Sequence, residues 1–482
     1  MIRLSLAFSL AFVVCGCTDK DQAEQQLGST DVRVDHPASD NDPDSGGTQM
    51  CVNDNGEIFV VWVDDRDGTP DIWFNRSLDL GVQWMPSDVK INRGFENNVW
   101  DPAIGCNNEG VFVAWEDDRD GELQNHQIYF SRSLDQGDTW SVDDLLLELD
   151  PDGLSFSQGP QVAVDGSNVH VVWYDNINGA YDIYMATSEN DGENWGDPVR
   201  VDSDEPAGSA FSGAPQLVAV NQKDVYVVWE DTRDGNSDIY FARSDNSGSS
   251  FKSDKRLDGG DDNGANNSFA PKLDADGDNV FVVWHDTRNG EGRDVFFNFS
   301  SDNGKNWSNT AQRMDSDQPA FFNSTFPVVA LIGDTAHVAW QDNRFDGYDI
   351  FYRLYNGFDP QGEEVRVDLG DNEGFTNSTT PIIADNGTDV AITWQDQRGD
   401  AESDSGYNDL YYNLTTGGFE FSEPDLRIDS MEPGQSFKVD VNTHIHGQKL
   451  FTVWTDGRLG TSDIFFSSLT LGEESTYVSP AQ

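Results

Sequence analysis

The chain has 482 residues, including 14 Trp, 29 Phe and 13 Tyr, and its 29 Lys+Arg against 87 Asp+Glu give a net charge of −58. A surface this negative repels nucleic acids and anionic lipids, so we expect no nucleic-acid partner. The aromatic residues supply enough area to bury, which argues against a disordered acidic chain.

The N-terminus has the pattern of an export signal. Arg3 precedes an apolar stretch of eleven residues, 4–14, which is too short to span a bilayer as a helix. The sequence "VCGC" follows and looks like the lipobox of bacterial lipoproteins, with Gly16 before Cys17. This predicts a signal peptide over 1–16, a lipidated Cys17 and a polar tether over 17–30; the alternative is an ordinary signal peptide with a chance cysteine. Because Thr18 rather than Asp follows, the pattern favours the outer membrane of a bacterial envelope, with the lipid as the only membrane contact.

The strongest signal in the rest of the chain is an internal repeat. A Trp ends an apolar run eight times, at spacings of 53 to 60 residues. Asp follows two positions later in all eight copies, and Arg follows at the fourth position in seven, with Ile177 as the exception. The repeated residues are Trp62, Trp115, Trp173, Trp229, Trp284, Trp340, Trp394 and Trp454.

Each repeat reads as four short strands, called A to D here, with no helical period of useful length. Strand A is expected to start at Pro, where the missing N–H is tolerated. Strand B is the Val-rich run into Trp, apolar on consecutive positions and therefore covered on both faces. Strand C is the aromatic run such as "DIYF", and strand D has the form Arg-apolar-Asp.

The chain ends distinguish a closed ring from a solenoid. The first Arg-apolar-Asp segment, residues 33–35, precedes the first Trp, whereas the last repeat ends after strand C. Pairing the two would complete the last unit and close a ring. We therefore predict an all-β, eight-bladed β-propeller of four-stranded antiparallel blades, closed by an N-terminal strand in the last blade. The predicted propeller covers 31–470, with a tail over 471–482.

Five predicted turns between strands C and D carry a family resemblance. The segments "SLDLGVQW" (77–84), "SLDQGDTW" (133–140) and "SSDNGKNW" (300–307) match the Asp-box, and 188–195 and 244–251 are variants of it. The Asp accepts from turn N–H groups, and Gly supplies a positive φ. With the W-x-D-x-R pattern, the chain over about 31–470 resembles the sialidase-like Asp-box propellers, also called bacterial neuraminidase repeat proteins.

The resemblance implies a fold rather than an activity. Sialidases of this kind are six-bladed and use three Arg, a Tyr–Glu pair and an Asp, with an Arg-Ile-Pro motif that is missing here. We therefore assign no catalytic residue and leave open whether the chain is an enzyme. The repeated Asp and Arg after each Trp favour a structural role; the alternative is one sugar site per blade. We expect each of these Arg to pair with the Asp that opens strand C (Asp71, Asp238 and Asp294) or ends strand D (Asp202, Asp258 and Asp315).

Ligand-binding residues are expected where the B–C and D–A connections meet, on the face opposite the Asp-boxes. Aromatic rings beside small polar residues suit sugar stacking and hydrogen bonding. The alternative is that these rings fill gaps between blades. The candidates are the aromatic residues Trp100 and Phe322, the variable residues after Trp (Glu116, Tyr174, Glu230 and His285), and His126 in an insertion of the second repeat. One interpretation groups Glu116, Glu230 and His285 as an acid/base set; the alternative is that these three side chains lie in solvent.

Two weaker patterns concern calcium and a disulfide. "DADGD", with Asp274, Asp276 and Asp278, resembles part of a calcium loop but lacks the twelve-residue EF-hand spacing, and an ordinary turn is the alternative. Cys51 and Cys106 occupy similar positions in strand A of the first two repeats, and an exported protein can form disulfides. A bond between them requires a Cα separation below about 7 Å.

Together these patterns predict a monomeric, exported, lipid-anchored propeller that binds a glycan or an envelope protein through its loop-rich face. The alternatives are a glycoside hydrolase or lyase with a site near the axis, and a structural scaffold of a surface complex. An enzyme should show a cluster of carboxylates at the channel mouth that is not repeated in every blade.

Overall fold

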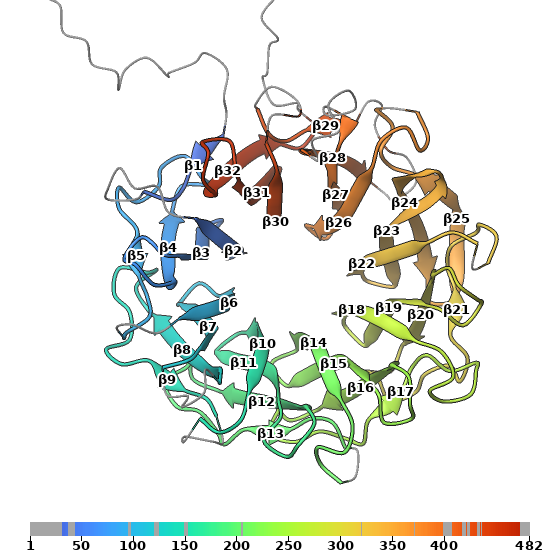
Figure 1. Ribbon diagram of the computed structural model, residues 1–482, viewed down its shortest axis with the longest axis horizontal. Coiled ribbons are helices and arrows are strands. Elements are labelled where there is room, and N and C mark those ends of the chain that lie inside the picture. Colours follow the sequence, from blue (N-terminus) through green and yellow to red (C-terminus); the bar gives the residue numbers. More distant parts are fainter. Residues whose placement is uncertain are drawn as a thin grey trace, which may run out of the picture.

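The computed structural model describes residues 31–36, 44–94, 98–119, 125–148, 153–203, 206–319, 321–370, 372–398, 407–416, 421, 425–430, 434 and 436–472. They form a ring of eight four-stranded sheets (Figure 1), which confirms the predicted eight-bladed propeller. None of these residues belongs to a helix long and apolar enough to cross a bilayer. The predicted signal peptide and Cys17 lie outside the described residues.

Each blade runs from the central channel outward, and its four strands are antiparallel. The innermost strands are β2 (Ser45–Val52), β6 (Val99–Cys106), β10 (Ser157–Asp165), β14 (Ser212–Val220), β18 (Ser268–Asp276), β22 (Ser324–Ile332), β26 (Ser378–Asp385) and β30 (Lys438–His446). The second strands are β3 (Ile58–Asp64), β7 (Val111–Asp117), β11 (Asn168–Asp175), β15 (Asp224–Asp231), β19 (Asn279–Asp286), β23 (Thr335–Phe345), β27 (Asp389–Asp396) and β31 (Lys449–Asp456). The third strands are β4 (Asp71–Ser77), β8 (Gln127–Ser133), β12 (Asp182–Ser188), β16 (Asp238–Ser244), β20 (Asp294–Ser300), β24 (Gly347–Asn356), β28 (Asp409–Thr416) and β32 (Asp463–Thr470). The outermost strands are β5 (Val89–Lys90), β9 (Leu145–Leu146), β13 (Val199–Arg200), β17 (Lys255–Arg256), β21 (Gln312–Arg313), β25 (Asp359–Arg366), β29 (Leu426–Arg427) and, in blade 8, β1 (Val32–Arg33).

The core lies between neighbouring blades rather than within one blade. Each second strand is buried along most of its length, and all eight repeated Trp are among the largest fully buried side chains. Such a strand needs apolar residues on both faces because a blade lies on each side of it. This arrangement explains why the sequence shows consecutive apolar residues instead of an alternation.

The ring closes as the sequence predicts. β1 pairs antiparallel with β32, with Val32 opposite Phe466 and Arg33 opposite Phe465, so blade 8 contains strands from both ends of the chain (Figure 1). The Val34 N–H donates to the Ile464 carbonyl at 2.8 Å, and the Val34 side chain is fully buried. β1 thereby covers the edge of β32, and the outer edge of blade 8 is then a strand as short as those of most other blades.

The innermost strands begin before the Pro residue at which we expected them to start. Pro102, for example, is the fourth residue of β6, and the pairing with β7 shifts register between Trp100 and Ala103. A bulge residue needs no ladder partner, so Pro is tolerated there. The residue at the bulge has a positive φ in every blade: Gly47, Asp101, Gly159, Ala214, Ala270, Phe326, Thr380 and Asp440.

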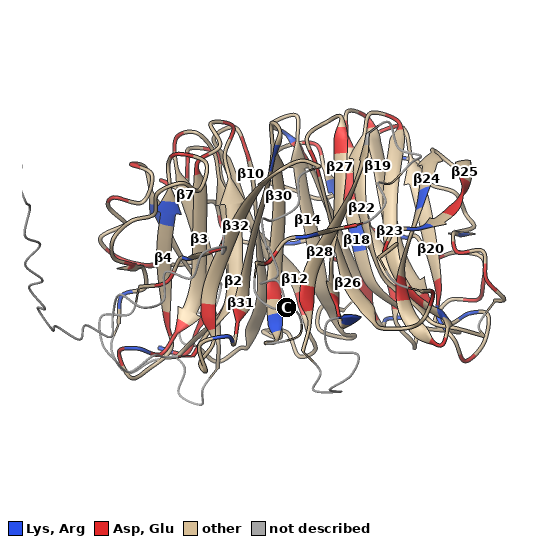
Figure 2. Ribbon diagram, turned by 90° about the horizontal axis from the view of Figure 1, so that it is seen from above, with Lys and Arg blue, Asp and Glu red and all other residues tan. Residues whose placement is uncertain are grey.

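Antiparallel strands place the connections on two faces of the ring. The loop face carries the B–C and D–A connections, and the box face carries the A–B and C–D turns. On the box face, the turn chemistry is as expected: the Gln83 N–H donates to Asp79 Oδ1 at 2.8 Å, and Trp84 packs edge-on against Phe466 of the neighbouring blade at 5.0 Å. Seen from the side, acidic residues lie on both faces (Figure 2).

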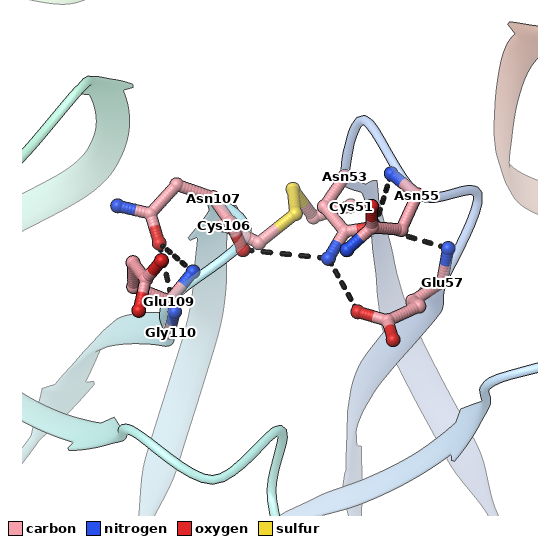
Figure 3. Close-up of a disulfide and its surroundings, with 8 residues drawn as sticks. All are labelled: Cys51, Asn53, Asn55, Glu57, Cys106, Asn107, Glu109 and Gly110. Atoms are coloured by element: carbon pink, nitrogen blue, oxygen red, sulfur yellow. Dashed lines mark hydrogen bonds between the residues drawn. A yellow bond between two sulfur atoms is a disulfide. The ribbon is translucent and has the colours of Figure 1, made fainter.

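A disulfide joins the innermost strands of blades 1 and 2 near the box face (Figure 3). The Cα atoms of Cys51 and Cys106 are 6.0 Å apart, and 55 residues separate them in the chain. Beside it, the Asn53 side chain donates to the Asn107 carbonyl at 3.4 Å. A loop of this length removes enough unfolded-state entropy to contribute about 4 kcal/mol to stability. The bond therefore links the two blades that follow the ring closure.

Candidate functional site

The Asp and Arg that follow each Trp form a repeated structural network rather than eight ligand sites. In blade 2, Asp117 accepts from the Trp115 indole at 3.1 Å and pairs with Arg119, whose guanidinium lies 4.1 Å from the Tyr129 ring. Arg119 also pairs with Asp144 at 2.7 Å. The predicted partners were therefore wrong, because the Arg folds back over strand C onto its own Asp and the acid before strand D. The other such pairs are Arg66–Asp64, Arg233–Asp231, Arg288–Asp286, Arg344–Asp342, Arg398–Asp396 and Arg458–Asp456.

The Asp residues that we assigned to those Arg are held by the basic residue of the outermost strand, which is Lys90 for Asp71 and an Arg for the others. Arg200, for example, lies 3.3 Å from Asp182 and 3.0 Å from Asp202. The same arrangement gathers Asp294, Asp315 and Asp317 around Arg313. Among the described residues these three form the one carboxylate group close enough to hold a metal ion. Because Arg313 pairs with all three, and because burial and the neighbouring acids raise the pKa of Asp315, we interpret the group as an ion-pair network.

These networks predict that the folded ring gains stability as the pH falls from 8 to 5. Burial raises the pKa of Asp202 and Asp409 to about 6, and that of Asp238 and Asp368 to about 7, although an Arg opposes the shift in each case. Through these carboxyl groups the folded state binds more protons than the unfolded state between the usual Asp pKa and about pH 7, so stability is lost as the pH rises through this window. Burial also lowers the pKa of His170, His285, His337 and His444 to about 4, which opposes the effect below the usual His pKa. The buried Asp274, Glu148 and Asp315, whose pKa values burial raises as well, add to the carboxyl contribution and keep its direction.

We expect a thermal unfolding midpoint about 3 °C or more higher at pH 5 than at pH 8, measured by circular dichroism at constant ionic strength. Asp238→Asn should reduce this difference. A midpoint that is higher at pH 8 would contradict the interpretation.

On the loop face, one blade departs from the repeat. Trp100, Glu116 and His126 come together there, as the sequence interpretation allowed. The His126 ring is stacked on Trp100, with centroids 4.2 Å apart and an interplanar angle of 9°, and lies 4.4 Å from Phe156 on another side. Its Nδ1 is 2.6 Å from Glu116 Oε2. Trp100 and Glu116 are opposite one another in the β6–β7 pair, which explains why the three side chains meet.

Glu116 fixes the orientation of His126. The carboxylate side chain is 3% exposed, and its other oxygen accepts from the Gly159 N–H of blade 3 at 2.8 Å. With both oxygens occupied, the carboxylate holds Nδ1 of the imidazole and leaves Nε2 as the nitrogen available to a ligand. His126 itself is 16% exposed, so it is half enclosed but reachable.

A second carboxylate, Asp101, lies beside this pair at the bulge of β6. Part of Asp101 is exposed, yet desolvation by the surrounding protein raises its pKa. The Glu116 and Asp440 carboxylates raise the pKa of Asp101 further, and His126 opposes them. A carboxyl group whose pKa is raised by burial and by neighbouring acids in this way is typical of functional sites.

Tyr174 completes the group, which we call the channel-mouth cluster: Trp100, Asp101, Glu116, His126, Phe156 and Tyr174. Burial raises the pKa of Tyr174 to about 12, and Glu116, Tyr181 and Asp101 add to the effect. The Tyr174 ring covers Gly159, where an added Cβ would lie 2.7 Å from the ring. A cavity of about 310 Å³ adjoins the cluster, with Asp101, Gly159 and Asp440 in its wall.

The other candidate residues lie in separate blades. In blade 4, Glu230 accepts from the Ala270 N–H at 2.8 Å, the same contact that Glu116 makes with Gly159, but no His accompanies it. His285 of blade 5 lies 5.8 Å from the Phe269 ring, and burial lowers its pKa to about 4. Phe322 of blade 6 packs against Phe321. The suggested set of Glu116, Glu230 and His285 is therefore wrong, because each faces a different junction between blades.

The predicted calcium residues do not gather at one point. The Asp274 and Asp276 carboxylates accept from the Leu331 and Gly333 N–H groups of blade 6, each at 2.7 Å. Asp278 is exposed in the turn that follows β18. Within the described part of the chain, the three do not form a carboxylate cluster of metal-binding size. Asp274 and Asp276 instead join two neighbouring blades.

Sequence reasoning missed Asp101 and Asp440, which lie at the bulge positions of two innermost strands. A signal was present: where Asp101 precedes Pro102, the other blades with Pro have Gly, Ala, Phe or Thr. An acidic residue at a position with positive φ that faces the channel is unusual enough to mark a site. The insertions at 122–126 and 400–408 fall largely outside the described residues.

Comparison with known proteins concerns the fold alone. No protein-family profile matches the sequence, and no curated protein is similar to it at a significant level. Solved structures of similar fold include the polysaccharide lyase Uly1, with 12% identity and a TM-score of 0.49 over 81% of this chain and 94% of that one. A PL25 ulvan lyase has 13% identity and a TM-score of 0.47 over 77% and 91% of the two chains. The sialidase NanB of Streptococcus pneumoniae has 12% identity and a TM-score of 0.37 over 72% and 64%.

Proposed function

We propose that this chain binds a carbohydrate at the channel-mouth cluster. The observation that carries the proposal is the stack of His126 on Trp100, with His126 held at 2.6 Å by the buried Glu116. Among the described residues this arrangement occurs in one blade of a ring whose other features repeat, and departures from a repeat are where a functional site is expected. The cavity of about 310 Å³ beside it offers room for a sugar ring.

The chemistry of the cluster suits a sugar. Half-buried aromatic rings offer faces for the C–H groups of a pyranose, and Asp101 offers oxygens to its hydroxyl groups. The hydroxyl of Tyr174, kept neutral by its raised pKa, can both donate and accept. Trp100 and Asp101 lie in β6, and Tyr174 lies in β11. Because these strands belong to the rigid inner part of the ring, the site is largely preformed.

A second candidate is a glycoside hydrolase or lyase, and one observation favours it. Asp101 has a raised pKa beside the Glu116–His126 pair, so a proton donor and a proton acceptor are present together at the channel mouth. In that case His126 Nε2 would accept or donate the proton, and Glu116 would position the imidazole. The glycans that bind are the substrates to test for turnover.

The envelope location is a proposal that rests on the sequence. Cys17 follows an apolar stretch of eleven residues and a small residue, which supports a lipid anchor. A tether over 17–30 would hold the ring at the membrane with the loop face free for glycans, or for a protein partner of the envelope. The net charge of −58 would keep the ring itself off an anionic bilayer.

The test is a glycan array probed with the soluble chain that begins at Thr18, with and without calcium. We expect selective binding by the natural sequence and a loss of at least about tenfold in affinity for Trp100→Ala, which removes the ring under His126. The matched control is Phe375→Ala, which removes a 67% exposed aromatic ring on the loop side of blade 7. It should bind like the natural sequence.

A blank array from a folded ring, or equal losses in both variants, would overturn the carbohydrate proposal and favour a protein partner. Binding that disappears without calcium would indicate that a calcium ion takes part in contacting the glycan. Binding without turnover of any bound glycan would reject the enzyme candidate and leave the binding function standing.

A further inference from the structure

A cavity of about 410 Å³ lies on the box face between blades 4 and 5, far in sequence from the channel-mouth cluster. Its wall comes from the A–B turns of both blades, the end of β16 and the box turn of blade 5. The lining residues are Asn221, Lys223, Asp224, Arg243, Asp245, Gly277, Asp278, Asn303 and Lys305. We call it the blade 4–5 cavity.

The cavity lies where the few lysines of this acidic chain concentrate. Of nine Lys in 482 residues, five fall between Lys223 and Lys305. Lys223 and Lys305 line the cavity and are both exposed, and Arg243 lies between them in the lining. Three cations and three carboxylates, Asp224, Asp245 and Asp278, line the cavity, so its wall is charge-balanced, and in a protein of net charge −58 an anion meets less repulsion there than over most of the surface.

Arg243 differs from its counterparts in other blades. Arg76 and Arg132 occupy the same position of strand C, and each donates to a backbone carbonyl in the box turn of the next blade, Gln136 and Asp191. The stem of Arg243 likewise packs near Gly304 of the next box turn. Its guanidinium, however, has no such carbonyl among the described residues, and its ion pair with Asp245 is long, at 3.8 Å. Asp245 is already held by Lys252 at 2.8 Å.

A buried hydroxyl group next to the cavity also lacks a partner. Tyr226 is fully buried, and its Oη makes no hydrogen bond of normal geometry within the described part of the chain, although the Asn303 side chain lies near enough to oppose the rise that burial causes in the pKa of Tyr226. The polar groups that act on this hydroxyl are Asp224, Asn303, Arg243 and Asp278, all of which line the cavity. The other blades have Phe, His or Ala at this position, three residues before Trp. A buried donor without a well-placed acceptor costs about 1–3 kcal/mol, and an anion in the cavity would supply such an acceptor.

We propose that the blade 4–5 cavity binds a small oxyanion, a carboxylate, sulfate or phosphate, either free or as the charged group of a saccharide. Arg243 and Lys305 would pair with its oxygens, and Tyr226 Oη would donate to one of them. Asp224, Asp278 and the two Asn would accept from or donate to neighbouring hydroxyl groups. This site lies on the opposite face from the channel-mouth cluster and does not depend on the function proposed for it.

The test is isothermal titration of the soluble chain with sodium sulfate, sodium phosphate and sodium glucuronate at low ionic strength. We expect at least one of them to bind with a dissociation constant below about 10 mM and to weaken with added NaCl. Arg243→Gln should weaken that binding by about tenfold or more, and Lys305→Gln should also weaken it. Tighter binding of glucuronate than of sulfate or phosphate would identify a saccharide as the source of the anion.

Two controls separate binding from folding. Arg132→Gln changes the same position of blade 2, where the guanidinium is already bonded, and should leave anion binding within about twofold. Tyr226→Phe should keep or raise the unfolding midpoint of the free protein, because it removes an unsatisfied group, but should weaken the anion by about threefold. No binding of any of the three anions, or equal affinity in Arg243→Gln and Arg132→Gln, would overturn the proposal.

Discussion

A chain that begins at residue 37 is expected to lose the folded ring, whereas a chain that begins at Asp31 is expected to keep it. The six residues between them supply the outermost strand of blade 8. Val34 is fully buried, and its carbonyl accepts from Asn75 of blade 1 at 3.0 Å, so the segment joins two blades as well as completing one. Arg33 pairs with Asp463 and Asp35, and Asp31 pairs with Arg458 at 2.8 Å.

The expected loss is large compared with the stability of a typical domain. Removing the Val34 side chain from the core costs about 2 kcal/mol. Breaking a buried ion pair by removing one partner costs about 3–5 kcal/mol, and here more than one is broken. Because native stabilities are about 5–15 kcal/mol, most truncated molecules should be unfolded or joined to other copies through the open edge of β32. Circular dichroism during heating and analytical ultracentrifugation measure both outcomes.

A rearranged chain provides the control. β1 runs antiparallel to β32, so residues 31–36 placed after residue 472 through a short linker would form a hairpin like the one between strands C and D in other blades. This variant should recover the unfolding midpoint of the natural order. If the truncated chain were as stable as the natural one, ring closure by β1 would not be what holds the ring together.

Much of this fold was predictable because a Trp marks the same position in every repeat. The eight evenly spaced Trp indicate eight blades. The segment 33–35, which precedes Trp62 and has the pattern of an outermost strand, indicates that an N-terminal strand closes the ring. The start of the innermost strand was not predictable from Pro102 alone, because a Pro is tolerated equally at a strand start and at a bulge. The choice depends on the pairing register with the second strand, which only three-dimensional structure supplies.

Ion pairs were harder to assign for a similar reason. Each blade places several Asp within reach of two Arg, and sequence distance does not rank them. Arg119 pairs with Asp117, two residues away, because the strand end lets its side chain turn back over Tyr129. Arg200 instead bridges to Asp182 across a strand pair. In both cases the geometry of neighbouring strands, rather than charge, decides the partner.

The candidate site was predictable in part. Trp100, Glu116 and His126 stood out because they vary where the repeat is otherwise regular, and the structure brings these three together. The same reasoning grouped Glu230 and His285 with Glu116, which fails because equivalent positions in a ring lie in different blades. The ends of the second strands of blades 2, 4 and 5 face different junctions, whereas innermost-strand residues of more distant blades, such as Asp440 and Asp101, can reach one cavity beside the channel.

Replacing Glu116 by Ala is expected to weaken glycan binding by about thirtyfold or more, whereas replacing Glu230 by Ala is expected to leave it nearly unchanged. Both carboxylates accept from a backbone N–H at the bulge of the next blade, at 2.8 Å in each case. Removing either one leaves that N–H without its acceptor, so each variant should lose about 1–3 kcal/mol of stability. The expected loss of stability is therefore the same in the two variants. A difference in glycan affinity between them reports on the contacts of the second carboxylate oxygen.

That second oxygen distinguishes the two residues. Glu116 Oε2 holds His126 Nδ1 at 2.6 Å, but the corresponding oxygen of Glu230 meets only the Ser237 hydroxyl at 3.5 Å. Without Glu116, the imidazole loses the contact that fixes its tautomer and its orientation toward a ligand. We expect affinity for the glycan identified on the array to fall by about thirtyfold or more, which corresponds to a loss of about 2 kcal/mol.

Titration calorimetry with that glycan, alongside thermal unfolding of both variants, makes the comparison. A Glu116→Gln variant adds a third measurement, because the amide can still accept from the Gly159 N–H or from His126 while carrying no charge. If it binds the glycan as the natural sequence does, the role of Glu116 is to orient His126 by hydrogen bonding. If it binds no better than Glu116→Ala, the negative charge beside the imidazole is what the ligand requires. Equal affinity in Glu116→Ala and Glu230→Ala would instead mean that the Glu116–His126 pair is a structural contact, and that the carbohydrate site lies elsewhere on the ring.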